Sequence, residues 1–324
     1  MKKVVRVVLT LLLAALIIGA IYLKFLLPDV SNAPNLKVEI NSQMVERGKY
    51  LAYHVTVCMD CHSTRDWSKF SGPPIAGSDG KGGEYFSRNM GFPGDFYSKN
   101  LTPFHLKDWT DGDIYRAITS GVSKDGSSLF PVMPYIYYGK LAKEDVYAII
   151  AFLRTLPEIN NTPPARSLDF PVNLLINTMP QEAHPTTIPA QSDTLAYGAY
   201  LTNAAGCAEC HTPARNGQII KGKEFTGGRP FKMPSLTAYS ANITPDTATG
   251  IGAWTPEEFV ARFKAYTQPG GIPDATQNNS PQTVMPWTMY GGMDSTDLVA
   301  IYKYLSSLQP VKNHVDHFVF NKKE

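Results

Sequence analysis

All four cysteines of the chain fall in two motifs of the form Cys-x-x-Cys-His. Each motif supplies two thiols followed at once by an imidazole, and the residues are Cys58, Cys61 and His62, then Cys207, Cys210 and His211. In this pattern the two thiols can form thioethers with a haem, and the adjacent histidine can reach the iron as its proximal ligand. The motifs therefore predict two covalently bound haem c groups.

Two other uses of paired cysteines fit this pattern less well. The pairs could together form one four-cysteine zinc site, but they lie 149 residues apart, and each carries a histidine that such a site does not need. A thioredoxin-like redox pair belongs in a βαβ context, which the sequence does not indicate. Haem attachment is the reading that uses every residue of both motifs.

The iron of an electron-carrying haem needs a sixth ligand, and a thioether sulfur raises the potential by favouring ferrous iron. Met133 and Met285 occupy equivalent positions in two copies of a repeat, and each is followed by proline. They lie 71 residues after His62 and 74 residues after His211. A neighbouring proline restricts the backbone and would aim the sulfur reproducibly. Many methionines only fill a core, but the matched spacing favours Met133 and Met285 as axial ligands.

The two motifs lie in two copies of one module. The matching segments pair residues 48–51 with 198–201, 58–62 with 207–211, 82–86 with 227–231, 100–103 with 242–245, 109–110 with 254–255, and 133–156 with 285–308. Two copies of about 110 residues are typical of two domains, because a solenoid is built from three or more short repeats.

Each module is expected to consist of short helices separated by long loops. One helix leads into the Cys-x-x-Cys-His motif and a second follows a Trp-Thr pair, where Thr255, Pro256 and Glu258 form a strong helix start. Apolar residues at i, i+3, i+4 and i+7 indicate a last helix around 146–153 and 298–305. No alternating pattern of strands is persuasive. The expected fold class is therefore all-α, with much irregular chain.

The repeat also predicts the domain organisation. We expect tandem cytochrome c domains at residues 44–157 and 193–310, joined by a Pro-rich linker at 158–192 and followed by a C-terminal tail at 311–324. Seven prolines lie from position 157 to position 189, a density that is typical of a stiff, extended connection.

The N-terminus carries a separate signal. Residues 7–23 are uncharged and apolar, and the basic residues Lys2, Lys3 and Arg6 precede them. This length can span a bilayer, and the basic flank places the N-terminus in the cytoplasm. We expect a transmembrane anchor at 1–28 in contact with membrane lipid and a tether at 29–43. The haem domains would then lie on the periplasmic side of a bacterial cytoplasmic membrane. A cleaved signal peptide is the alternative, and it delivers the body to the same side.

The charge of the body argues against one class of partner. The chain has a formal net charge of +2, but residues 1–27 hold four of the 30 basic residues and none of the 28 acidic ones. The remaining 26 basic and 28 acidic residues give the body a net charge of −2. No basic stripe is present, so a nucleic-acid partner is not expected.

Several short segments carry a resemblance to a known family. They are residues 168–173 in the linker, 227–231, 242–246 and 249–252 in the second module, Trp254, and Met285 with Pro286. With them the chain resembles the cytochrome c subunits of membrane-bound alcohol and gluconate dehydrogenases, over most of residues 44–310. The resemblance implies class I cytochrome c domains with His/Met ligation. Subunits of that family carry three haems, whereas this chain has two motifs.

The expected function is electron transfer at the outer face of the membrane. The resemblance implies a dehydrogenase as donor and a quinone, cytochrome or terminal oxidase as acceptor, with this chain acting as a carrier and not as an enzyme. The alternative is a dihaem peroxidase, which needs one haem with an open or displaceable ligand. Two matched methionines argue against that alternative, and no signalling module that would indicate a haem-based sensor is recognisable.

Overall fold

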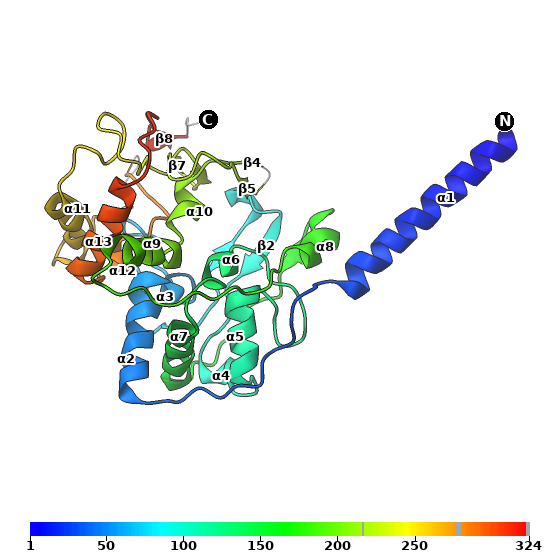
Figure 1. Cartoon of the computed structure of the whole chain (residues 1–324), viewed down its shortest axis with the longest axis horizontal. Coiled ribbons are helices and arrows are strands. Elements are labelled where there is room, and N and C mark those ends of the chain that lie inside the picture. The colour runs from blue at the N-terminus through cyan, green and yellow to red at the C-terminus, as the bar shows by residue number, and fades with distance from the viewer. Residues whose placement is uncertain (216, 277–279, 322–324) are drawn as a thin grey trace.

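The computed structural model describes residues 1–215, 217–276 and 280–321. A long N-terminal helix, α1 (Lys2–Ile21), continues into a π-helical turn, η1 (Tyr22–Leu26), and stands away from a body that contains the rest of the chain (Figure 1). Its 25 residues include an 18-residue stretch with a mean hydropathy of 2.7, and none of them is buried. By length and composition this helix can cross a membrane, and a signal sequence would have the same properties.

A packed pair of helices forms the centre of each half of the body. In the first half α2 (Ser42–Tyr50) packs on α7 (Lys143–Thr155), and in the second α9 (Thr194–Ala204) packs on α13 (Ser295–Ser306). The pairs join the first and last helices of each sequence module, so residues about 100 positions apart share one core. The sequence repeat is therefore also a structural repeat.

Glycine permits the close approach of both pairs. A Cβ atom at Gly48 would lie 1.8 Å from the carbonyl oxygen of Ala148, and one at Gly198 would lie 2.0 Å from that of Ala300. We expect Gly48→Ala to lower the free energy of unfolding by about 1–3 kcal/mol, the usual cost of overpacking a core. Denaturant unfolding measures it, with Lys49→Ala as the control on the neighbouring position. An unchanged midpoint for Gly48→Ala would contradict the tight crossing.

The remaining helices are short and are separated by long loops. They are α3 (Cys58–Cys61), α4 (Pro103–Leu106), α5 (Asp111–Ser120), α6 (Tyr135–Tyr138), α8 (Val172–Leu175), α10 (Cys207–His211), α11 (Pro256–Lys264) and α12 (Trp287–Tyr290), with single turns η2 (Leu51–Val55), η3 (Arg88–Met90), η4 (Ile176–Thr178) and η5 (Ala265–Thr267). The predicted start of α11 is confirmed: the Glu258 N–H donates to the Thr255 hydroxyl at 3.2 Å, and the Thr255 N–H donates to the Glu258 carboxylate at 2.7 Å.

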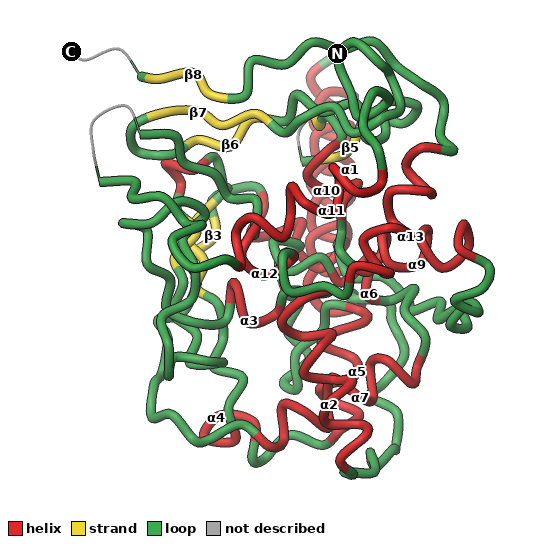
Figure 2. The backbone as a smooth tube through the Cα atoms, turned by 90° about the vertical axis from the view of Figure 1, so that its left-hand side faces the viewer, coloured by secondary structure: helices red, strands yellow, loops and turns green. Residues whose placement is uncertain are grey.

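The structure corrects the all-α expectation, because short strands make three small antiparallel sheets in the part of the chain that it describes (Figure 2). Their strands are β1 (Tyr85–Phe86), β2 (Gly94–Tyr97) and β3 (Ser167–Leu168), then β4 (Ala214–Arg215) and β5 (Gln218–Ile219), then β6 (Pro230–Lys232), β7 (Leu236–Tyr239) and β8 (Phe318–Phe320). Strands of two to four residues are too short for an alternating pattern to reveal them.

The segments that follow α7 and α13 pack back on the half to which that helix belongs. Strand β3 pairs with β2, and β8 pairs with β7, so the start of the Pro-rich segment and the C-terminal segment have the same role. The Asn100 side-chain amide donates to the carbonyl oxygens of Ile159 and Asn161 at 2.8 and 2.9 Å, and that of Asn242 donates to the Val311 carbonyl at 2.8 Å. These bonds close each half before the chain leaves it.

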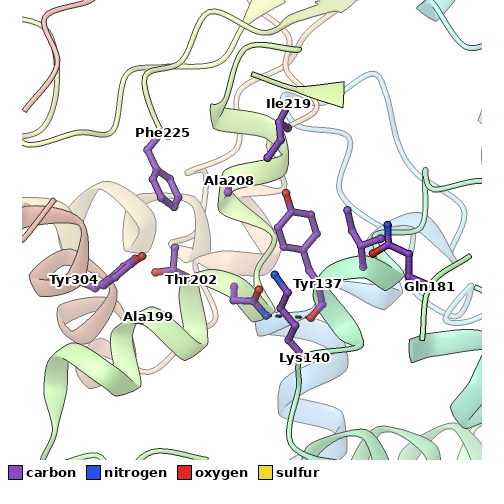
Figure 3. Close-up of a pocket in the computed structure, with 11 residues that line it drawn as sticks. Tyr137, Lys140, Gln181, Ala199, Thr202, Ala208, Ile219, Phe225 and Tyr304 are labelled. Atoms are coloured by element: carbon purple, nitrogen blue, oxygen red, sulfur yellow. Dashed lines mark hydrogen bonds between the residues drawn. The ribbon is translucent and has the colours of Figure 1, made fainter. Parts of the chain in front are cut away.

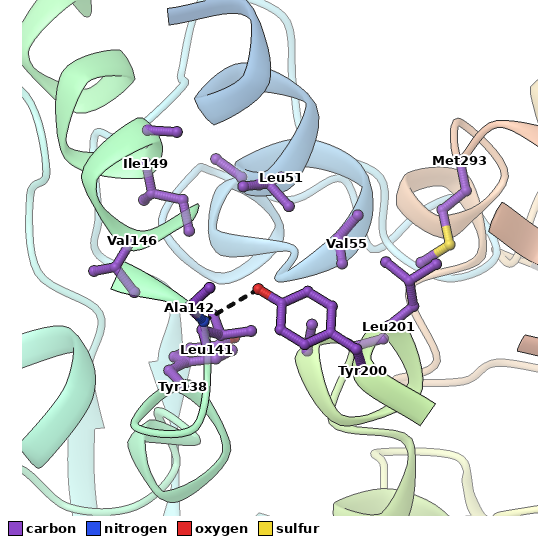
Figure 4. Close-up of a cluster of buried hydrophobic side chains, with 14 of the residues drawn as sticks. Leu51, Val55, Tyr138, Leu141, Ala142, Val146, Ile149, Tyr200, Leu201 and Met293 are labelled. Carbon is purple, nitrogen blue, oxygen red and sulfur yellow. Dashed lines mark hydrogen bonds between the residues drawn. The ribbon is translucent and has the colours of Figure 1, made fainter. Parts of the chain in front are cut away.

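The two halves meet through a reciprocal pair of hydrogen bonds. The Tyr50 hydroxyl donates to Asp297 of the second half at 2.7 Å, and the Tyr200 hydroxyl donates to Asp145 of the first half at 2.7 Å. Figure 4 shows Tyr200 in the core beside the helix start at Ala142, whose N–H donates to its hydroxyl at 3.2 Å. Both carboxylates are buried. Because equivalent residues contact each other in both directions, the interface has the self-complementary form of a two-fold dimer.

Candidate functional site

The two cysteine motifs adopt the same local structure. Each forms a single helical turn, α3 or α10, that begins after a residue in the left-handed conformation, Val57 with φ 47° and Gly206 with φ 63°. Glycine takes this conformation freely, whereas a β-branched valine is strained in it. The turn brings both thiols of a motif to one side, immediately before the histidine.

The histidine of each motif is oriented by a backbone carbonyl. The His62 Nδ1 lies 2.7 Å from the Lys99 carbonyl oxygen, and the His211 Nδ1 lies 2.8 Å from that of Ala241. A carbonyl oxygen only accepts, so Nδ1 carries the proton and Nε2 keeps its lone pair. Burial lowers the pKa of both imidazoles, which favours this neutral form. Such a bond is the usual means of orienting a metal-ligating histidine.

The thiols are free and are held in the neutral form. None of the four cysteines forms a disulfide, and burial raises the pKa of Cys61 to about 12, of Cys207 to about 12 and of Cys210 to about 11. A thiol with a raised pKa is a poor nucleophile for disulfide exchange. In the part of the chain that the structure describes, no three His, Cys, Asp or Glu side chains gather as a metal site. In the described residues the four thiols therefore do not meet in a four-cysteine zinc site.

Each Met-Pro segment is tied to the cysteine motif of its own half. Helix α6 follows Met133, and its Tyr138 hydroxyl donates to the carbonyl oxygen of Thr56, two residues before the first motif, at 2.6 Å. The equivalent α12 follows Met285, and its Tyr290 hydroxyl donates to the Ala205 carbonyl, two residues before the second motif, at 2.6 Å. Both methionines are half-buried against the core. The structure thus brings together, in each half, the segments that carry the predicted proximal and distal ligands.

These donor sets fit a haem c group. Each half offers two free thiols, an imidazole with an available Nε2, and a thioether in a segment bonded to the residues before the motif. Thioether, imidazole and paired thiols are the groups by which c-type haem is held. The donor groups are the same in both halves, and so are the bonds from the histidine Nδ1 and from the tyrosine hydroxyl.

An arginine accompanies the acidic residue inside each motif. The Arg229 guanidinium lies 2.7 Å from Glu209, and the Arg65 guanidinium lies 3.2 Å from Asp60. In the repeat of the sequence, Arg229 is equivalent to Glu84. The repeat therefore could not show that Arg65, from a different loop, forms the same kind of ion pair in the first half. The similarity exists only in three dimensions.

A cavity of about 360 Å³ lies between the halves, outside both sets of predicted ligands (Figure 3). Its lining includes Tyr137 and Lys140 from the first half, and Thr202, Ala208 and Phe225 from the second. Ala208 belongs to the second motif, and the Tyr137 hydroxyl donates to the neighbouring Glu209 at 3.2 Å. The cavity therefore borders the second motif at Ala208, and its lining includes none of the predicted thiol, imidazole or thioether ligands.

His54 has a structural role that the sequence did not indicate. Its Nδ1 lies 2.9 Å from the Met289 carbonyl of the second half, and the Asn203 amide donates to the Tyr137 carbonyl of the first half at 3.0 Å. The two contacts are equivalent, because His54 and Asn203 each lie four residues before the first cysteine of their motif. The first-half segment before the motif is one residue longer, and the extra residue is accommodated in the π-helical turn η2. A repeat alignment that allowed for this extra residue would have paired His54 with Asn203.

Comparison with known proteins bears on the second half. Residues 195–309 match the family model described as Cytochrome c. This segment is similar to cytochrome c domains. It contains Cys207, Cys210, His211 and Met285, and a cytochrome c domain implies covalently bound haem c. This match supports the prediction of covalently bound haem c in the second half.

Other known cytochromes are similar to this chain over most of its length. The cytochrome c subunit of alcohol dehydrogenase (quinone) from Gluconobacter oxydans is 27% identical over 288 residues, covering 84% of this chain and 56% of that subunit. The gluconate 2-dehydrogenase cytochrome c subunit of Pantoea cypripedii is 27% identical over 293 residues, covering 83% and 60%. A protein described as diheme cytochrome c-type from Cereibacter sphaeroides is 29% identical over 198 residues, covering 58% and 63%.

These comparisons confirm the predicted resemblance to dehydrogenase cytochrome subunits. The chain spans about 60% of the length of the curated relatives that it matches first. Their names therefore describe proteins that are longer than this chain.

Proposed function

We propose that the chain is a dihaem electron carrier with tandem cytochrome c domains at residues 44–157 and 193–310. Each domain holds one covalent haem c, through Cys58, Cys61 and His62 or through Cys207, Cys210 and His211. Met133 and Met285 are the sixth ligands. The observation that carries the proposal is the repeated hydrogen bonding of both motifs: a backbone carbonyl on the histidine Nδ1 and a tyrosine hydroxyl joining the methionine segment to the motif.

When bound, haem iron supplies one-electron redox chemistry. The residues of this chain would hold it for that purpose: the imidazoles are fixed in one tautomer, and the Met-Pro backbone has little freedom. The buried Tyr–Asp pairs keep the two halves in one arrangement. A rigid site suits a carrier, because little has to move when the charge changes.

A dehydrogenase is the proposed electron donor, and a quinone, a cytochrome or an oxidase is the proposed acceptor. The support is the similarity to cytochrome subunits of alcohol, gluconate and fructose dehydrogenases. These relatives give no support to a dihaem peroxidase. We further propose that α1 anchors the body at the periplasmic face of the cytoplasmic membrane, with residues 158–192 as the linker between domains.

Carbon monoxide binding tests the carrier function. If both irons are ligated by histidine and methionine, the reduced native protein should bind little carbon monoxide and should turn over peroxide at a negligible rate. The measurement is a carbon monoxide difference spectrum beside a peroxide assay. Stoichiometric binding at one haem with rapid peroxide turnover would instead establish a peroxidase.

The membrane anchor makes a separate prediction. The full-length protein should stay with the membrane fraction after a high-salt wash, because salt weakens surface electrostatics but not the burial of an apolar helix. Replacing residues 1–28 by a cleavable signal peptide should release a soluble protein with the same haem content. A soluble full-length protein whose mature N-terminus lies near residue 34 would favour the signal peptide.

A further inference from the structure

A buried loop of the first half holds the segment around Met285 in the second half. The Ser71 hydroxyl donates to the Met285 carbonyl oxygen at 2.6 Å and accepts from the Trp287 N–H at 3.1 Å. The Ser71 N–H also donates to the Gln282 side chain at 2.7 Å. Ser71 is 0% exposed, so these bonds form away from water. The Ser71 hydroxyl therefore bonds to the backbone on both sides of Pro286, at Met285 and at Trp287.

The loop is held in a backbone conformation that needs support. Ser71 has φ 69° and Gly72 has φ 52°, and the left-handed region is unfavourable for a residue with a side chain. The Arg65 guanidinium stabilises this turn by donating to the Gly72 carbonyl at 2.7 Å and to the Ser71 carbonyl at 2.6 Å. Arg65 itself is buried and lies over the Trp67 ring at 4.1 Å.

The same arginine connects the loop to the first cysteine motif. Its third contact is the ion pair with Asp60, at 3.2 Å, and Asp60 lies between Cys58 and Cys61. A continuous set of buried contacts therefore runs from the first motif through Arg65 and Ser71 to the backbone of Met285. Charge-assisted and well-buried hydrogen bonds of this kind restrict geometry more than exposed ones do.

Met133 has no equivalent clamp among the described residues. The hydrogen bond that its carbonyl accepts there comes from the Tyr135 N–H of the same segment, at 2.8 Å. The Met285 carbonyl accepts the matching bond from Trp287 at 2.8 Å and the Ser71 bond in addition. Among the described residues, this carbonyl of a methionine accepts a bond from the opposite half at Met285 and not at Met133.

We propose that Ser71, supported by Arg65, is a positioning residue for Met285. The loop of the first half holds the Met285 backbone so that its thioether stays on the haem of the second half. This inference rests on the proposed ligation by Met285. It predicts that a change in the first half alters the ligation of the second haem while leaving the first haem unchanged.

The test removes the Ser71 hydroxyl in two ways from the full-length dihaem protein. Ser71→Ala deletes it, and Ser71→Gly deletes it while relieving the left-handed strain, so that misfolding and loss of the hydroxyl are separated. Ser78→Ala is the matched control, because among the described residues the Ser78 hydroxyl bonds to Thr64 and Ile75 of the same loop and to no residue of the second half. Met285→His marks the spectral contribution of the second haem.

The readouts are the weak red absorption band of ferric His/Met haem and carbon monoxide binding by the reduced protein. Both Ser71 variants should lose part or all of the same band intensity that Met285→His removes, and should gain carbon monoxide binding at up to one site per chain. The Ser78 control should behave as the native protein. Native bands in both Ser71 variants, or equal disturbance of both haems, would overturn the inference. An unchanged band in Met285→His would instead show that the ligand assignment is wrong.

Discussion

Replacing Cys207 and Cys210 together by serine should leave a chain with one covalent haem in place of two. A serine hydroxyl does not form the thioether that holds the haem, so only the first motif would remain loaded. Mass measurement under denaturing conditions counts the attached groups directly. The matched variant, Cys58 and Cys61 to serine, should also leave one haem, now on a peptide that contains the second motif.

The same variants should show how far the halves depend on each other. Loss of the proposed haem would remove its contacts with one half, while the reciprocal Tyr50–Asp297 and Tyr200–Asp145 bonds would still join that half to the intact one. We therefore expect the unloaded half to become sensitive to protease before the loaded one. Two attached haems after loss of either cysteine pair, or none in the native chain from cells that attach haem c, would contradict the proposed sites.

Replacing Met285 by histidine should lower the potential of one haem by an amount on the order of 0.1–0.3 V, a fraction of the ~0.8 V range over which axial ligands act. The imidazole stabilises ferric iron more than a thioether does. Met133→His should have the same effect on the other haem. A potentiometric titration followed by absorbance resolves the two steps.

Two other methionines that precede proline provide the control for this prediction. Met179 and Met233 also precede proline but have no equivalent in the other half, so Met179→His and Met233→His should leave both potentials near their native values. If Met133→His and Met285→His change neither spectrum nor potential, the sixth ligands must be sought elsewhere. A shift of both haems by one substitution would show that the sites are strongly coupled.

The local chemistry of the site could be predicted from the sequence because it depends on residue type and short spacing. Two thiols and a histidine within five residues define their own geometry, since one helical turn is enough to present them. The helix start at Thr255 and the last helices of both modules are likewise local patterns. The apolar N-terminal helix follows from composition alone.

The short strands and the partner of each buried polar group could not be predicted in this way. Strands β3 and β8 return from distant parts of the chain to pair with β2 and β7, and the other strands, two to four residues long, are too short to show an alternating pattern. Tyr50 and Tyr200 match in the repeat, as do Asp145 and Asp297, yet the repeat alone cannot show that each pairs with the opposite half. Such pairings depend on how the halves pack.

The sequence by itself determined which groups can hold haem c, that they occur twice, and that an apolar helix precedes them, because covalent attachment and hydropathy are properties of short segments. Only the tertiary structure decided that Arg65 and Ser71 of one half hold the Met285 backbone of the other, across 214 positions of the chain. The physical reason is that the partners of a buried hydrogen bond depend on which surfaces pack together and exclude water. That packing brings together residues whose separation along the chain carries no signal.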